Sequence, residues 1–288
     1  MTSEERWARC RFFTASVLPV RVACNCACLF CFSRSSVSAL PGEGERLRAL
    51  DVEGHLRWAR ARGATRAVLT GGGEPLLVPE LAVWLVSIAR RVFDEVALFT
   101  NAARLTPALA ERFGAAGLSY LCWSRHHHDD DRNRALMGPD APARDAVLAA
   151  VGALPVRATC VLSQGFVDSP EAVREYLRVF QDLGVRSFTF KHTYVAYARS
   201  LFRGSPQDGW ARSHRVALDP FEGLGEVLLR LPWGPTVRRL EGADLCFYQE
   251  PTPEWELSHG LCRSSNLLSD GRVYASLEDT RSLLYRLQ

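Results

Sequence analysis

The chain has 288 residues, of which 47% are hydrophobic and 23% charged, a composition typical of a globular protein and not of a disordered one. A formal net charge of +3, without a long basic block, gives no reason to expect a nucleic-acid partner. No apolar run is long enough to span a membrane, and the N-terminus lacks the apolar centre of a signal peptide. We therefore expect a cytoplasmic protein without a membrane partner, in which the nine cysteines stay reduced.

Short apolar runs rich in β-branched residues alternate with longer helical patterns between residues 16 and 195. The expected strands cover 16–23, 66–70, 95–100, 118–123, 156–163 and 187–194. The expected helices begin at Asp51, Pro79, Thr106, Ala141 and Ser169. Thr106 and Ser169 each place a capping hydroxyl directly before a proline, which is favoured at the first helical position.

Six strand–helix alternations imply parallel strands joined by right-handed crossovers. Six units are too few for a closed eightfold barrel. The predicted fold is therefore α/β, a partial (β/α)6 TIM-like barrel over residues 17–200, preceded by an N-terminal segment, 1–16. In such barrels the chemistry lies on loops at the carboxyl ends of the strands.

The alternation ends after residue 200, and we expect residues 201–288 to form an α+β extension that covers the barrel mouth. A helix is predicted within 220–231, followed by β segments within 244–249 and 264–277. The turn between the two halves of the last segment is predicted at 269–272, because Asp-Gly at its centre favours a hairpin.

Four cysteines crowd into eight positions directly after the first predicted strand: Cys24, Cys26, Cys28 and Cys31. Such thiols can bind zinc, hold an iron–sulfur cluster or be buried. A structural zinc site uses four ligands, usually in two separated pairs, whereas three thiolates in one loop better suit an iron–sulfur cluster.

The pattern Cys24-x3-Cys28-x-Phe30-Cys31 resembles the signature of the radical S-adenosylmethionine (radical SAM) superfamily. The resemblance implies one [4Fe–4S] cluster on these three cysteines, with one iron left open to S-adenosylmethionine (SAM). It also implies reduction by a donor such as flavodoxin or ferredoxin, and cleavage of SAM to a 5′-deoxyadenosyl radical that abstracts a substrate hydrogen. Cys26 matches no ligand position and is expected to be a bystander.

The sequence TGGGEP at 70–75 resembles the superfamily's glycine-rich motif, which aligns the SAM amino group. Glycines let a backbone approach a ligand closely, and Glu74 could neutralise a cationic amine. Residues at later strand ends carry over as further contacts to SAM. The cofactor-binding candidates are Gly71, Gly72, Gly73, Glu74, Asn101, Ser124, Arg125 and Gln164.

Histidines and aspartates at 126–131 are contiguous, so their side chains splay apart and we expect a solvated turn and helix cap rather than a metal site. The alternative is that His126 or His127 faces the barrel. Lys191 is the single lysine among 35 basic residues. On the sixth strand either Lys191 or His192 can face inward, and we expect Lys191 to anchor an anionic group there.

The last predicted hairpin resembles the cysteine–glycine–cysteine pattern of SPASM and twitch extensions, but Ser276 stands at the second cysteine position. We therefore expect one cluster, with the hairpin retained as a lid. Cys246 and Cys262 then either pack as small apolar side chains or return a hydrogen atom to a substrate radical. Lys191, Cys246 and Cys262 are the catalytic candidates.

Only about 16 residues precede the predicted barrel, whereas peptide-modifying members of the superfamily often begin with a longer recognition module, so we expect a small polar substrate. The first hypothesis is natural-product tailoring, such as epimerisation or dehydrogenation of a sugar, aminoglycoside or nucleotide derivative. The second is modification of a ribosomal peptide, by epimerisation or cross-linking. A third, from another class, is a non-catalytic zinc or iron–sulfur module.

Overall fold

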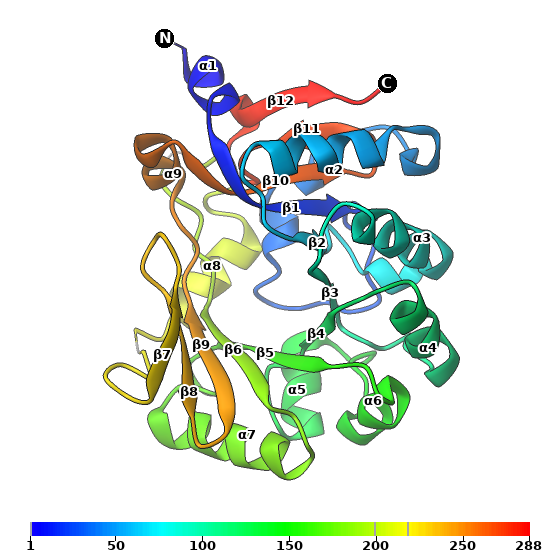
Figure 1. The fold of residues 1–288 in the computed structure, drawn as a ribbon. Helices are drawn as coiled ribbons and strands as arrows, with labels where there is room; N and C mark the ends of the chain where they lie inside the picture. The colour runs from blue at the N-terminus through cyan, green and yellow to red at the C-terminus, as the bar shows by residue number, and fades with distance from the viewer. Residues whose placement is uncertain (1, 199, 218) are drawn as a thin grey trace.

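A single mixed sheet organises the chain (Figure 1). The computed structural model describes residues 2–198, 200–217 and 219–288. The strand order is β12-β11-β10-β1-β2-β3-β4-β5-β6-β9-β8-β7, and the eight strands from β10 to β9 run parallel. The strands are β1 (Arg11–Leu18), β2 (Ala67–Leu69), β3 (Val96–Thr100), β4 (Tyr120–Ser124), β5 (Val156–Leu162), β6 (Ser187–His192), β7 (Glu226–Arg230), β8 (Thr236–Leu240), β9 (Ala243–Tyr248), β10 (Leu261–Leu268), β11 (Arg272–Tyr274) and β12 (Leu283–Arg286).

Helices connect the parallel strands and cover the outer face of the curved sheet (Figure 1). The predicted caps are present: the Thr106 and Ser169 hydroxyls accept from the backbone amides of Leu109 and Ala172. The helices are α1 (Ser3–Ala8), α2 (Val52–Ala61), α3 (Pro79–Arg90), α4 (Pro107–Ala115), α5 (Asp130–Met137), α6 (Arg144–Val151), α7 (Pro170–Asp182), α8 (Pro206–Ser213) and α9 (Pro253–His259). Short 3-10 helices lie at 32–35, 37–39, 47–49, 75–77 and 280–282 of the described chain.

The main hydrophobic core lies between the sheet and these helices. It contains large, fully buried side chains such as Trp7, Phe12, Trp123, Tyr176 and Phe180. The partial barrel predicted from the sequence is confirmed, because the parallel sheet is curved but does not close: β9 and β10 are not paired.

The first strand lies earlier than expected, at Arg11–Leu18 instead of 16–23. Pro19 follows its last residue and has no amide hydrogen to continue the ladder. Residues 20–23 instead bond to the loop after β2, where the Gly73 and Glu74 amides donate to the carbonyls of Val20 and Ala23. Residues 20–23, which were expected to form the end of the first strand, are therefore the first half of the cysteine loop.

The C-terminal third adds strands to both edges of the sheet. β10 pairs in parallel with β1, and β9 with β6, so two parallel strands join the six that the sequence predicted. The β10–β11 hairpin and its turn are confirmed, with Gly271 at a φ of 86°. The helix predicted within 220–231 is wrong, since Glu226–Arg230 forms β7, which pairs with β8.

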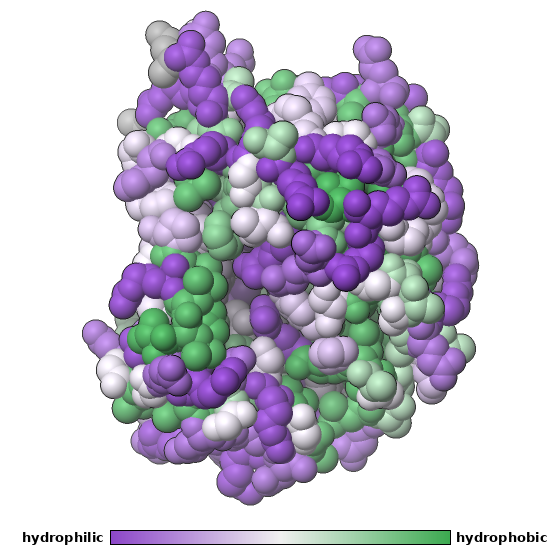
Figure 2. Space-filling view, viewed as in Figure 1, coloured by the Kyte–Doolittle hydropathy of each residue, from purple (hydrophilic) through white to green (hydrophobic). Residues whose placement is uncertain are grey.

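Apolar side chains gather on the surface over the β7–β8 hairpin, at the lower left of Figure 2. They include Leu224, Val227, Leu228 and Leu229. No helix within the described ranges is both long and apolar enough to cross a bilayer.

Candidate functional site

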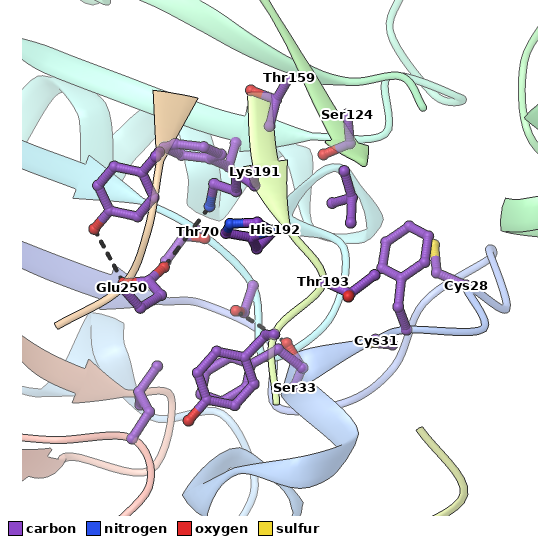
Figure 3. A pocket seen from close by; sticks show the side chains of 18 of the residues that line it. Cys28, Cys31, Ser33, Thr70, Ser124, Thr159, Lys191, His192, Thr193 and Glu250 are labelled. Carbon is purple, nitrogen blue, oxygen red and sulfur yellow. Dashed lines mark hydrogen bonds and ion pairs between the residues drawn. The ribbon is translucent and has the colours of Figure 1, made fainter. Parts of the chain in front are cut away.

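A cavity of about 520 Å³ opens at the carboxyl ends of the parallel strands. A volume of this size is typical of sites that bind small molecules and cofactors. Figure 3 shows Cys28 and Cys31 on one side of it and Lys191 and Glu250 on the other. The predicted residues that border it are Cys24, Cys28, Cys31, Gly71, Gly73, Glu74, Asn101, Ser124 and Lys191.

The cysteine loop is held by the end of α5. The amides of Ala27 and Leu29 donate to the carbonyls of Met137 and Leu136, at 2.7 and 3.1 Å. These carbonyls belong to the last turn of the helix, where no intrahelical donor is available. The helix end therefore fixes the middle of the loop, between Cys24 and Cys31.

The glycine-rich segment packs against the first half of the same loop. A Cβ on Gly72 would overlap the Arg21 carbonyl, and one on Gly73 would overlap the Ala23 carbonyl. Glycine is required here because two backbones approach each other too closely for any side chain. Gly72 does not border the cavity. Its role is to clamp the cysteine loop, while Gly71 and Gly73 also face the cavity.

Glu74 is buried, with 3% of its surface exposed, and accepts three hydrogen bonds from the protein. The donors are the Thr100 hydroxyl at 2.5 Å and the amides of Asn101 and Leu76, each at 2.8 Å. Burial raises the pKa of this carboxyl, while these hydrogen bonds act in the opposite direction. The carboxylate thus ties the β2 loop to the β3 loop.

The thiols are suited to three-point attachment of a cluster. Burial raises the pKa of Cys28 and Cys31, whereas donation from Cys26 lowers the pKa of Cys24 to about 7. Within the described ranges, no three His, Cys, Asp or Glu side chains lie close enough together to share one metal ion. A cluster does not require them to meet at a point, because each thiolate can bind a different iron. The donor set and its position on a cavity wall therefore fit an iron–sulfur cluster.

Cys26 also borders the cavity but is mostly turned away from solvent, with 4% exposed. It packs with Leu136, Met137 and Ala141 behind the loop. This packing agrees with its predicted role as a bystander, which stays a prediction.

Lys191 faces the cavity, as expected, but is not alone there. Its ammonium lies 3.8 Å from Glu250 and over the rings of Phe99 and Tyr248 (Figure 3). His192 borders the cavity as well, because β6 ends at this residue and strict alternation no longer applies. An anionic ligand would therefore have to compete with Glu250 for the Lys191 ammonium.

His126 is the histidine of the 126–128 run that reaches the cavity. Burial lowers its pKa to about 3, so the ring is neutral. The Val161 amide donates to Nδ1 at 3.1 Å, which leaves the ring proton on Nε2. His127 and His128 lie outside the cavity, and Asp129 caps α5, as the sequence suggested.

Besides Gly72, four predicted residues are not brought to the cavity. The Arg125 guanidinium is buried and bonds to Asp130 and to the carbonyls of His127, His128 and Pro142. Gln164 lies in an exposed turn after β5. Cys262 points to the outer side of the sheet, where it packs in the main core, in hydrogen-bond contact with Cys10. Cys246 lies two residues before Tyr248 on β9, and unlike Tyr248 it does not border the cavity.

Sequence reasoning missed the cavity residues that the C-terminal third supplies. They include Tyr248, Glu250, Arg263 and Glu278. Glu250 lies just past the end of β9, so the strand-end rule would have found it had β9 been recognised as a parallel strand. Glu278 lies in an irregular segment, and no local pattern points to it.

Comparison with known proteins finds a matching family model, a relative in sequence and similar solved structures. The family model described as the radical SAM superfamily matches residues 18–162. The probable GTP 3′,8-cyclase of Thermoplasma volcanium is 29% identical over 136 residues, or 47% of this chain and 39% of that protein. SuiB of Streptococcus suis bound to S-adenosylmethionine aligns with a TM-score of 0.60 and 14% identity. In its complex with the precursor peptide SuiA the TM-score is 0.56 and the identity 16%.

The structural alignments cover 93% of this chain but 60% of SuiB. The chain therefore spans about two fifths of the length of the cyclase and three fifths of that of SuiB. At these identities the likeness to SuiB concerns the fold alone.

Proposed function

Because the chain belongs to the radical SAM superfamily, we propose that it uses a SAM-derived radical to abstract hydrogen from a small polar substrate in the 520 Å³ cavity. Enzymes of this family use a [4Fe–4S] cluster and SAM. The observation that carries the proposal is that Cys24, Cys28 and Cys31 border one cavity together with the glycine-rich loop.

In this proposal Cys24, Cys28 and Cys31 would hold one cluster, which would supply the electron for reductive cleavage of SAM. Cys28 and Cys31, whose pKa values are raised by burial, lose their protons when they bind iron, so attachment depends on pH. A flavodoxin or ferredoxin is the proposed electron donor.

The protein's own contribution is positioning. Gly71 and Gly73 present backbone at the cavity wall without side chains in the way. Glu74 fixes the loops after β2 and β3 relative to each other, and its direct contact with a SAM amine stays a prediction. Ser124 and His126 face the cavity from the end of β4 and can donate hydrogen bonds to the cofactor or substrate.

Dehydrogenation and epimerisation both stay proposed outcomes; dehydrogenation would require the oxidised cluster to take up the electron of the substrate radical as its proton leaves. An epimerisation that ends with hydrogen return from a thiol needs a cysteine beside the substrate. Neither Cys246 nor Cys262 borders the cavity, and Cys262 packs against the opposite face of the sheet. The hydrogen-return role proposed for these residues thus lacks a supporting contact.

A ribosomal peptide is the second candidate substrate. The observation in its favour is that the chain aligns over 93% of its length with SuiB bound to the precursor peptide SuiA. A gene for a short precursor peptide beside this one would favour the peptide over the small molecule.

The direct test is anaerobic reconstitution with iron and sulfide, followed by SAM and a strong reductant. The proposal expects 5′-deoxyadenosine by mass spectrometry, and none with Cys28→Ala. Arg46→Ala, which removes an exposed arginine paired with Glu43, serves as the matched control and should retain the product. Absence of 5′-deoxyadenosine from a protein that carries the cluster would refute the proposal.

A further inference from the structure

A second, smaller cavity of about 30 Å³ lies against the main one. Tyr194, Glu250, Arg263 and Glu278 border both. A space of this size holds one or two groups the size of water. What distinguishes it is a surplus of hydrogen-bond acceptors on its walls.

Asn266 on β10 contributes the first acceptor. Its Nδ2 donates to the carbonyls of Ser264 and Tyr274, at 3.0 and 3.1 Å. Two carbonyl partners fix which end of the amide is nitrogen, so Oδ1 is the end left over. This oxygen is buried and has no hydrogen-bond partner within the described residues, although the side chain is only 2% exposed.

Glu278 contributes a carboxylate. The residue is 7% exposed, and it accepts one hydrogen bond, from the Tyr197 amide at 3.1 Å. No cationic side chain in the described ranges lies within 4 Å of it. A buried carboxylate without a counter-charge is costly, and burial raises its pKa to about 8.

Tyr194 contributes a phenolic oxygen. Its ring packs against Phe32, with the centroids 4.2 Å apart, and its hydroxyl is buried without a partner among the described residues. Three residues from separate segments, at 194, 266 and 278, thus border the same small space, and each carries an oxygen with unused acceptor capacity among the described residues.

Acidic side chains outnumber basic ones on the wall of the small cavity. Glu250, Glu256 and Glu278 border it, against Arg263 as the cation among the described lining residues. Arg263 is engaged with Glu250 at 3.0 Å, and its backbone amide donates to Glu256 at 2.7 Å. The neighbouring Lys191 also faces Glu250. Among the described residues, neither Glu256 nor Glu278 forms an ion pair, and Glu278 is the one of these two carboxyls that also borders the main cavity.

We propose that the small cavity binds a primary ammonium group of the substrate, with Glu278, Asn266 and Tyr194 as its acceptors. An ammonium has three N–H donors and a positive charge, and so matches three acceptors of which one is anionic. A water molecule has two donors and would leave the carboxylate uncompensated. The inference rests on the proposed function in that the amine belongs to the substrate of the main cavity.

The test is calorimetric titration of the reconstituted, full-length protein with n-butylammonium and with its uncharged analogue n-butanol. The ammonium should bind and the alcohol should not. Glu278→Gln keeps the shape of the side chain and should weaken ammonium binding ~tenfold or more. Tyr194→Phe should weaken it about threefold. Glu254→Gln, an exposed change on α9, is the matched control and should have no effect.

Equal binding of alcohol and ammonium, or unchanged affinity in Glu278→Gln, would show that the cavity holds water only. A single cooperative thermal unfolding transition in each variant confirms that the fold is intact. A lysine tripeptide with blocked ends and glucosamine then distinguish a peptide amine from a small-molecule amine. Since binding is read without SAM cleavage, ammonium binding without 5′-deoxyadenosine would refute the proposed function and leave the ammonium site standing.

Discussion

The carboxylate of Glu74 accepts a hydrogen bond from the backbone amide of Asn101 at 2.8 Å, which joins the loop after β2 to the loop after β3. The Asn101 side chain continues the chain of contacts. Its Nδ2 donates to Asn25 Oδ1 at 2.9 Å and lies 3.6 Å from the Cys24 sulfur. Glu74 thereby acts on the cysteine loop through Asn101, in addition to facing the cavity itself.

Glu74→Gln should destabilise the protein and loosen the cysteine loop. The glutamine side chain keeps one oxygen acceptor, but its NH2 group cannot accept the hydrogen bonds that Thr100, Asn101 and Leu76 donate to the carboxylate. A buried donor left without an acceptor costs about 1–3 kcal/mol. Urea unfolding measures this, and Glu80→Gln is the control, because Glu80 is exposed and pairs with Arg112 at the surface. Equal losses in the two variants would contradict the positioning role of Glu74.

Cys26→Ala should retain the cluster, whereas Cys28→Ala should lose it. Cys26 packs behind the loop, and its loss removes one small buried group, while Cys28 supplies a sulfur on the cavity wall. The readout is the broad absorbance of the reconstituted protein near ~400 nm, where thiolate–iron charge transfer occurs. Loss of the band from Cys26→Ala, or its retention in Cys28→Ala, would reassign the ligands.

Gly72→Ala should impair folding of the cysteine loop. The new methyl group would overlap the Arg21 carbonyl, and relief requires backbone movement at a cost of about 3 kcal/mol or more. Gly114→Ala is the control, since a Cβ there meets open space in α4 and should stabilise the helix by about 0.5–1 kcal/mol. Thermal unfolding of the two variants should therefore shift in opposite directions, and similar shifts would exclude the clamp.

Glu278 should make the protein less stable as the pH rises. Its native pKa is about 8, above the ordinary value of 4.5, so the folded state binds more protons than the unfolded chain between these values. The free energy of unfolding then falls with increasing pH across that window. Relative to the wild type, Glu278→Gln should gain on the order of 4 kcal/mol between pH 5 and 8.5.

Urea unfolding at several pH values gives this difference. Contributions from Glu250, Glu256, Arg263 and the cysteines are common to both proteins and cancel in the comparison. Parallel stability profiles for the variant and the wild type would show that Glu278 ionises normally in the native state.

Local sequence signals were sufficient to predict the partial barrel and to locate the cysteine loop. The caps at Thr106 and Ser169, the β-branched runs and the cysteine spacing are all contained in short windows of sequence. The glycine-rich segment was also recognisable locally, although its main physical role, close packing against residues 21–23, became visible only with the fold.

The remainder depends on contacts between distant segments. Leu261 pairs with Arg11, 250 residues earlier, and no local pattern predicts that partner. The run at 220–231 has helical spacing of apolar residues, but its residues 226–230 form a strand because β8 is available to pair with them. Arg125 follows a strand as a ligand-binding residue would, yet its guanidinium finds carbonyl partners inside the loop that follows.

The central claim is that one cavity-facing iron of a three-cysteine cluster is left open to SAM. Electron paramagnetic resonance of the reduced, reconstituted protein, recorded with and without SAM, tests this directly. The account predicts one cluster signal whose shape changes when SAM is added, in the wild type and in Cys26→Ala alike. A reduced-cluster signal that SAM leaves unchanged would contradict it.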